Sequence, residues 1–290
     1  MTLLLQAILD GLTNGAMYAL LAIGMVMYYR SSRIINLAHG ETFVAAALTT
    51  VLLIRAGQPP VVGMLAGVVV ATMLALGIER FIIRPRLAWS PSMIVMLTLG
   101  MAFTLSGVGR LVGGTTPYSF PYIIDLGSVR LGAAVIHPQA LLLIAVTVTI
   151  GGALVFFFRH AALGKAMTAA AENPMASQLL GINIHRLRAL SFGLAGLLGG
   201  IASALVVPLG YVDYSRGLAL VLQGFVAAAI ASMLFPDRAL VSGLALGVIE
   251  ALVAAFGNPL YRTPFVFGVI LMVALVLLSR SVAFGGAARA

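Results

Sequence analysis

The chain has 290 residues and a formal net charge of +9; 61% of its residues are hydrophobic, only 9% are charged, and the mean hydropathy is +1.11. Because a soluble domain has about 25% charged residues, this composition excludes a soluble enzyme, a disordered chain and a surface-bound peripheral protein. What remains is an integral membrane protein, whose spans are helices or a closed barrel because lipid cannot satisfy open backbone groups.

Long apolar segments follow one another along the chain without the two-residue alternation of a membrane barrel. The sequence therefore predicts an all-α polytopic transmembrane helical bundle of about 8–9 spans, with residues 1–290 forming a single transmembrane domain. Several polar residues lie at the start of the second segment. This segment is therefore either a full span or, as the alternative, a half-span or re-entrant helix. The segments are 3–29, 37–55, 60–83, 92–113, 139–158, 187–208, 217–235, 239–257 and 264–280.

The positions of the basic residues predict the orientation of these spans. If the N-terminus lies outside, five of the 17 Lys and Arg residues fall outside and the other twelve inside, as the positive-inside rule requires. The excess of positive charge then marks loops that face anionic lipid, and no nucleic-acid partner is needed to explain it. We expect the N-terminus outside and the C-terminus inside. The five outer residues are Arg55, Arg110, Arg130, Arg216 and Arg262.

Two loops interrupt the apolar pattern. The outer loop, at about 114–138, has Gly127-Ser128 between apolar flanks and predicts a short β-hairpin. The inner loop, at about 159–188, predicts an Ala-rich helix over 163–172. A second helix follows, with Asn173 as its N-cap and Pro174 at its first position, and Gly181 ends it.

The second of these helices carries a small apolar face made by Met175, Leu179 and Leu180. Two interpretations stand side by side. The loop packs against its own bundle, or the face is a docking surface for a cytoplasmic partner.

Polar groups within spans are costly, so each needs a reason. The candidates for the translocation path or a gate are Asn36, His39, Glu41, Asp10 and Glu250. The alternative is a satisfied polar network that locks the helices together. Glycines four residues apart, as at Gly11/Gly15 and Gly243/Gly247, favour close helix packing within the chain over a contact between subunits.

The inner loop contains the stretch GKAMTAAAENPMASQLLGINIHRLRALSFGLAGLLGGIASAL, and residues 31–43 read SSRIINLAHGETF. These two stretches resemble the inner-loop signature and the "gvINfAHGe" segment of permease subunits of bacterial ABC importers, in the branch that takes up branched-chain and other hydrophobic amino acids. GLTNGAMYALLAIGMVMYY at 11–29 and SGLALGVIEAL at 242–252 are similar to the family's first helix and its penultimate region. The four occur in family order and cover about a third of the chain.

The resemblance implies a type II ABC importer-like permease in a bacterial inner membrane, surrounded by membrane lipid. The chain has no phosphate-binding loop, so it is expected to be no enzyme and to need no cofactor or metal. The expected partners are cytoplasmic ABC ATPase subunits, a second permease subunit that forms a heterodimer, and a periplasmic or surface substrate-binding protein. The residues implied in ATPase coupling are Glu172, Asn173, Pro174, Ala176, Leu179, Leu180 and Gly181.

Alternatives stay open at this point. The substrate is a branched-chain or other amino acid, or in a related importer urea or a short amide. A proton-coupled secondary transporter with Asp10, Glu41 and Glu250 as carriers would need inverted repeats, and none is evident; a membrane scaffold is a further alternative. The chain also departs from the family: residues 231–239 lack the usual glycines of the pattern "GG.GS..GA", and residues 279–285 lack its proline.

Overall fold

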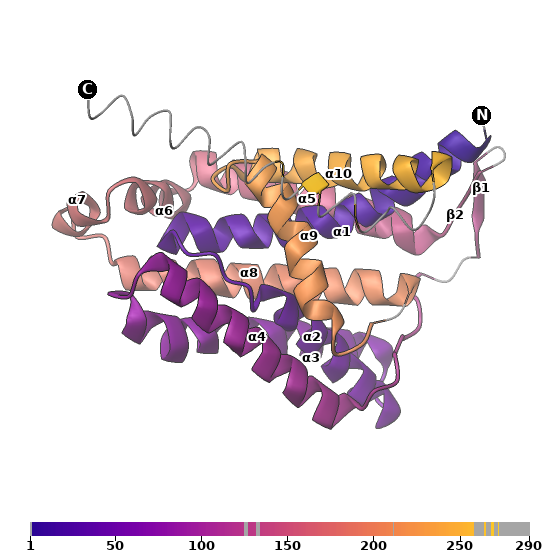
Figure 1. Ribbon diagram of the computed structural model, residues 1–290, viewed down its shortest axis with the longest axis horizontal. Helices are drawn as coiled ribbons and strands as arrows, with labels where there is room; N and C mark the ends of the chain where they lie inside the picture. Colours follow the sequence, from indigo (N-terminus) through magenta and orange to yellow (C-terminus); the bar gives the residue numbers. More distant parts are fainter. Residues whose placement is uncertain are drawn as a thin grey trace.

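A computed structural model describes residues 2–124, 127–131, 134–210 and 212–257, together with residues 264, 268, 269 and 272 (Figure 1). In chain order the elements are α1 (Thr2–Ser32), α2 (His39–Arg55), α3 (Pro60–Gly77), the π-helix η1 (Ile78–Ile83), the 3₁₀ turn η2 (Arg84–Arg86), α4 (Pro91–Gly113), β1 (Val129–Leu131), β2 (Ala134–Ile136), α5 (Pro138–His160), α6 (Ala162–Glu172), α7 (Pro174–Leu179), α8 (Ile184–Val206), the 3₁₀ turn η3 (Val207–Leu209), α9 (Arg216–Ile230) and α10 (Pro236–Phe256).

Long apolar helices dominate the described residues and confirm the predicted helical membrane bundle. Two predicted segments, 37–55 and 217–235, correspond to the shorter helices α2 and α9, of 17 and 15 residues. The last predicted segment, 264–280, lies mostly outside the described residues. Within the described part of the chain, six helical stretches are long and apolar enough to cross a membrane: Leu3–Ser32, Pro60–Arg86, Pro91–Gly113, Pro138–His160, Ile184–Leu209 and Pro236–Phe256.

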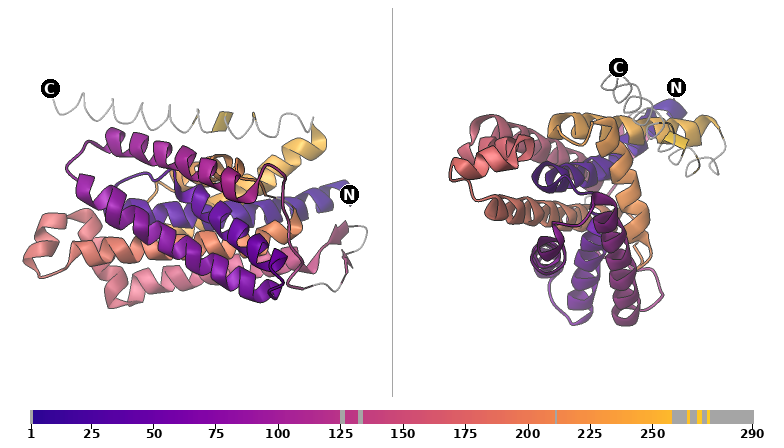
Figure 2. Two further views of the ribbon diagram at one scale, coloured as in Figure 1. Left: turned by 90° about the horizontal axis from the view of Figure 1, so that it is seen from below. Right: turned by 60° about the vertical axis from the view of Figure 1, so that its left-hand side comes forward.

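The two shorter helices differ from the long ones in where they run. α9 crosses the bundle at a steep angle to the long helices, as Figure 1 and the right-hand view of Figure 2 both show. α2 begins inside the molecule: residues 33–38 leave the helical conformation after α1, and its first residue, His39, is fully buried. The polar residues that raised the alternative of a half-span or re-entrant helix therefore lie inside the molecule, at the start of α2.

Close glycine contacts hold the long helices together. A Cβ atom on Gly247 of α10 would lie 2.3 Å from the Cα atom of Gly15 of α1, and one on Gly200 of α8 would lie 2.7 Å from the Cα atom of Val68 of α3. Only glycine allows backbones to approach this closely, and in lipid such approach replaces the hydrophobic driving force. These glycine pairs pack within the chain, as predicted.

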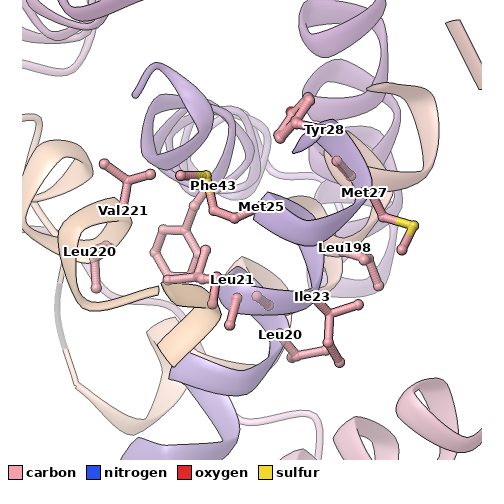
Figure 3. Close-up of a cluster of buried hydrophobic side chains, with 14 of the residues drawn as sticks. Leu20, Leu21, Ile23, Met25, Met27, Tyr28, Phe43, Leu198, Leu220 and Val221 are labelled. Atoms are coloured by element: carbon pink, nitrogen blue, oxygen red, sulfur yellow. The ribbon is translucent and has the colours of Figure 1, made fainter. Parts of the chain in front are cut away.

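The interior is built around the middle of α1. Figure 3 shows Leu21 and Met25 of α1 gathered with Phe43 of α2 and with Leu220 and Val221 of α9. All five side chains are buried, and their dense packing holds α9 against α1 and α2.

The long helices define two opposite ends of the molecule (Figure 1). The hairpin end carries the start of α1 together with β1 and β2, which are joined to α1 by a hydrogen bond from Gln6 Nε2 to the carbonyl oxygen of Val135. The α7 end carries α6 and α7. The predicted hairpin exists, but Gly127-Ser128 is not its turn: the strands pair from Val129 opposite Ile136, so both residues precede β1. The apolar residues of the loop correctly indicated strands. The three pairs run from Val129 opposite Ile136 to Leu131 opposite Ala134, so the turn lies after β1 and not at Gly127-Ser128.

Candidate functional site

The loop at the α7 end has the local structure that its sequence predicts. Asn173 Oδ1 accepts a hydrogen bond from the backbone N–H of Ala176 at 3.0 Å, and Pro174 follows at the first helical position. Gly181 has a φ of +80°, in the left-handed region, and the N–H of Ile182 donates to the carbonyl oxygen of Ser177 at 3.0 Å. Capping at both ends makes α7 a defined helix despite its six residues.

α7 projects from the rest of the molecule (Figure 1). Met175, Leu179 and Leu180 are 78%, 86% and 80% exposed. We call these three side chains the α7 face. The residues implied in ATPase coupling, from Glu172 to Gly181, all lie on this exposed segment. Such an apolar surface outside the spans is typical of a protein–protein contact.

Two arginines at the end of α1 anchor this loop to the bundle. The Nη2 group of Arg30 donates to the hydroxyl of Thr168 on α6, and its guanidinium lies 4.3 Å from the ring centre of Phe158. Arg33 Nη2 donates to the carbonyl oxygen of Ala171 at 3.0 Å. A displacement of α6 therefore acts directly on the end of α1 and on the segment that follows it.

That segment leads to the buried centre, which we define as Asn36, His39 and Glu41. Asn36 and His39 have no exposed surface, and Glu41 is 3% exposed. Asn36 Oδ1 accepts from the N–H of Ala38 at 3.0 Å. The His39 ring packs edge-on against Tyr28 at 5.0 Å, and its Nε2 has no hydrogen-bond partner within the described residues.

The first turns of α2 and α9 meet at this centre. A Cβ atom on Gly40 would lie 1.8 Å from the carbonyl oxygen of Gly217, and one on Gly217 would lie 2.2 Å from Glu41 Oε1. The Glu41 side chain thus lies in the first turn of its own helix and against the first turn of α9. A carboxylate there is favourable for both helix dipoles.

Comparison with known proteins identifies the chain. The family described as branched-chain amino acid transport system / permease component matches residues 7–275. The chain belongs to this permease family. It is 28% identical over 287 residues to the high-affinity branched-chain amino acid transport system permease protein LivH of Salmonella typhimurium, which covers 94% of this chain and 93% of LivH.

Two further comparisons accompany this match. The corresponding permease protein BraD of Pseudomonas aeruginosa is 29% identical over 285 residues, with 93% of each chain covered. The solved structure of PsaBC from Streptococcus pneumoniae in complex with Fab matches with a TM-score of 0.49 and 12% identity, over 91% of this chain and 89% of that one. Membership of the permease family confirms the resemblance found in the sequence.

Two cavities of the permease lie beside α1 in the half nearer the hairpin end. The first has a volume of about 150 Å³. Its polar lining residues are Thr13, Asn14 and Arg216, and most of the others, such as Phe43, are apolar. The second, of about 230 Å³, is lined by Gln6, Asp10 and Asn14 together with residues of α10. Asn14 lines both cavities, and its amide makes no hydrogen bond within the described residues.

The path candidates chosen from the sequence do not form one site. Asp10 is exposed beside the second cavity and accepts a hydrogen bond from Gln6 Nε2 at 3.0 Å, whereas Glu250 is 2% exposed within α10. The buried centre lines neither cavity. Asn14 is not among the candidates predicted from the sequence, although it follows Asp10 by four residues and so shares its helix face.

Proposed function

We propose that this permease carries branched-chain amino acids as a translocation subunit of an ATP-driven ABC importer in a bacterial inner membrane. Its family and the names of LivH and BraD support this substrate class over urea or short amides. In this proposal the chain forms a type II permease of 8–9 spans, which counts α2, α9 and the segment 264–280 besides the six long helices.

The partners follow from the two ends of the molecule. Cytoplasmic ATPase subunits dock on the α7 face, and a substrate-binding protein delivers the amino acid at the hairpin end. A second, related permease subunit completes the pore. The observation that carries this assignment is the α7 face, three large apolar side chains that are at least 78% exposed on a capped helix outside the spans.

The anchoring contacts supply the mechanical link. Movement of α6 reaches α1 through Arg30 and Arg33, and the segment after Arg33 leads to the buried centre between α2 and α9. In this proposal, closure of the ATPases tilts the helices between outward and inward openings by way of these contacts. The cavities beside α1 form the outer part of the path.

Leu180→Asp tests the docking assignment. Leu180 is 80% exposed, so the substitution leaves the fold intact, but docking would bury an unpaired carboxylate. Such burial costs more than about 1.4 kcal/mol, so we expect association with the ATPases and amino-acid uptake to fall at least about tenfold. Gly181 is a poorer target, because any side chain there strains its left-handed backbone.

The matched control is Leu180→Met, which keeps the surface apolar and should retain coupling. The measurements are co-purification of the ATPases, stimulation of their ATP hydrolysis, and uptake into proteoliposomes. Unaltered uptake and stimulation in Leu180→Asp would show that the ATPases do not dock on the α7 face.

A further inference from the structure

The membrane helix α3 continues at the α7 end as the π-helix η1, which changes which side chains share a face. The N–H of Arg84 donates to the carbonyl oxygen of Glu79, five residues back. In an α-helix residues five apart point about 140° away from each other, whereas the wider π turn brings them closer to one side of the helix. η1 therefore brings Arg84 toward the side that carries Glu79.

This face of η1 packs against α8, where Arg188 lies one turn from the start of the helix. Glu79 is 1% exposed and Arg188 is 9% exposed. Glu79 interacts electrostatically with Arg188, Arg84 and Arg80, and Arg188 also interacts with Arg84. We call Glu79, Arg80, Arg84 and Arg188 the arginine cluster.

The charges of the arginine cluster do not balance within the chain. The cluster combines three guanidinium groups with one carboxylate, and among the described residues His185 is the further titratable group that acts on Glu79. The Nε and Nη1 groups of Arg188 and the Oε1 atom of Glu79 are buried and have no hydrogen-bond partner within the described residues. Guanidinium donors in such a position are satisfied best by an anionic oxygen.

Large apolar side chains next to the cluster are exposed. Phe81 on η1 is 74% exposed, and Trp89, three residues after η2, is 46% exposed. Trp is enriched where a membrane meets water, and large exposed apolar side chains beside it suit acyl chains. The Arg86 guanidinium lies 5.5 Å from the Trp89 ring centre and donates to the carbonyl oxygen of Ile82 at 2.8 Å.

We propose that the arginine cluster binds the phosphate headgroup of an anionic phospholipid, with the acyl chains along Phe81. A phosphate diester offers the acceptor oxygens that the guanidinium groups lack, and its negative charge offsets part of the excess positive charge. The site fixes the junction of α3 and α8 at the membrane surface. It is independent of the substrate and ATPase assignments above.

Lipid retention by the full-length permease tests this proposal. The wild-type permease and the variant Arg80→Gln/Arg84→Gln are reconstituted in nanodiscs of phosphatidylglycerol and phosphatidylcholine. Each protein is then released from the nanodiscs in mild detergent, and native mass spectrometry counts the lipid molecules that remain bound. Arg80 is exposed and Arg84 is half-buried, whereas the buried Glu79 and Arg188 stay unaltered, so the fold should be kept. We expect retained phosphatidylglycerol to fall roughly tenfold, as the loss of two arginines at a membrane surface implies.

The control removes the same charge elsewhere at the same end. Arg159→Gln/Arg238→Gln alters two exposed arginines outside the cluster and should retain phosphatidylglycerol as wild type does. Arg188→Lys keeps the charge but loses the guanidinium fork and should weaken retention as well.

Three results would overturn the proposal. One is equal retention in the cluster variant and the control, and another is retention of phosphatidylcholine as strong as that of phosphatidylglycerol. The third is a cluster variant that loses its ATPase subunits in lipid-free detergent, since that would identify an acidic protein surface as the missing anion.

Discussion

At the scale of single residues, the turn between α9 and α10 stands out. Ser232 and Met233 have φ angles of +59° and +55°, in the left-handed region that favours glycine. This is the stretch where the chain lacks the glycines of its family's pattern. The turn thus keeps a left-handed path that its own residues disfavour, at a cost of about 1–2 kcal/mol each.

Ser232→Gly should therefore stabilise the permease. Ser232 is exposed, so little packing is lost, and relief of the backbone strain outweighs the greater freedom of glycine in the unfolded chain. We expect a gain of about 0.5–1 kcal/mol, seen as a higher midpoint of thermal unfolding in detergent. Ser232→Ala keeps the strain and is the control; an equal rise in both variants would contradict the explanation.

At the scale of elements, the permease depends on the meeting of α2 and α9. Both helices start at the buried centre, where Gly40 and Gly217 bring their backbones into contact beside Glu41. Hydropathy records only how apolar a segment is, so the sequence predicted 217–235 as a span without its direction. Packing against α1 and α2 holds α9 at a steep angle to the long helices.

Gly40→Ala tests this contact. The added methyl group would lie 1.8 Å from a backbone oxygen of Gly217, so the two helices must separate. We expect a loss of about 1–3 kcal/mol of stability, visible as reduced yield and a lower unfolding midpoint. In Gly107→Ala of α4 the methyl group meets no atom within 4 Å, and stability should hold or rise. Equal stability of both variants would argue against the close approach.

At the scale of the whole molecule, the hairpin end and the α7 end should lie on opposite sides of the membrane. The start of α1 and the hairpin lie at one end, and α6 and α7 lie at the other (Figure 1). The chain contains no cysteine, so single introduced cysteines report accessibility without background. Ser128 at the hairpin end and Gln178 on α7 are both exposed.

With the N-terminus outside, a membrane-impermeant maleimide should label Ser128→Cys in intact spheroplasts. Gln178→Cys should react only after the membrane is opened. Labelling in denaturant shows that both cysteines are present. The opposite pattern would reverse the orientation that the basic residues predict.

The path along α1 is a second property of the whole molecule, since its two cavities are lined by residues of α1, α2, α5, α8, α9 and α10. Asn14→Leu removes the amide shared by both cavities. If that amide holds the polar part of the amino acid, uptake should fall roughly tenfold, the effect of about 1.4 kcal/mol. Unfolding should be little changed. Thr149→Val is the control, because Thr149 is exposed on α5 and donates to its own helix at Ala145; equal uptake by both variants would remove Asn14 from the path.

The sequence by itself determined the membrane class, the long helices and the capped inner-loop helix. Composition and local chemistry suffice for these, since Asn173, Pro174 and Gly181 act on neighbours within a few residues. Only the tertiary structure decided that α9 runs across the bundle, that Gly40 meets Gly217, and that Arg188 joins the face of η1. Each depends on side chains from distant segments packing against one another, which spacing along the chain does not encode.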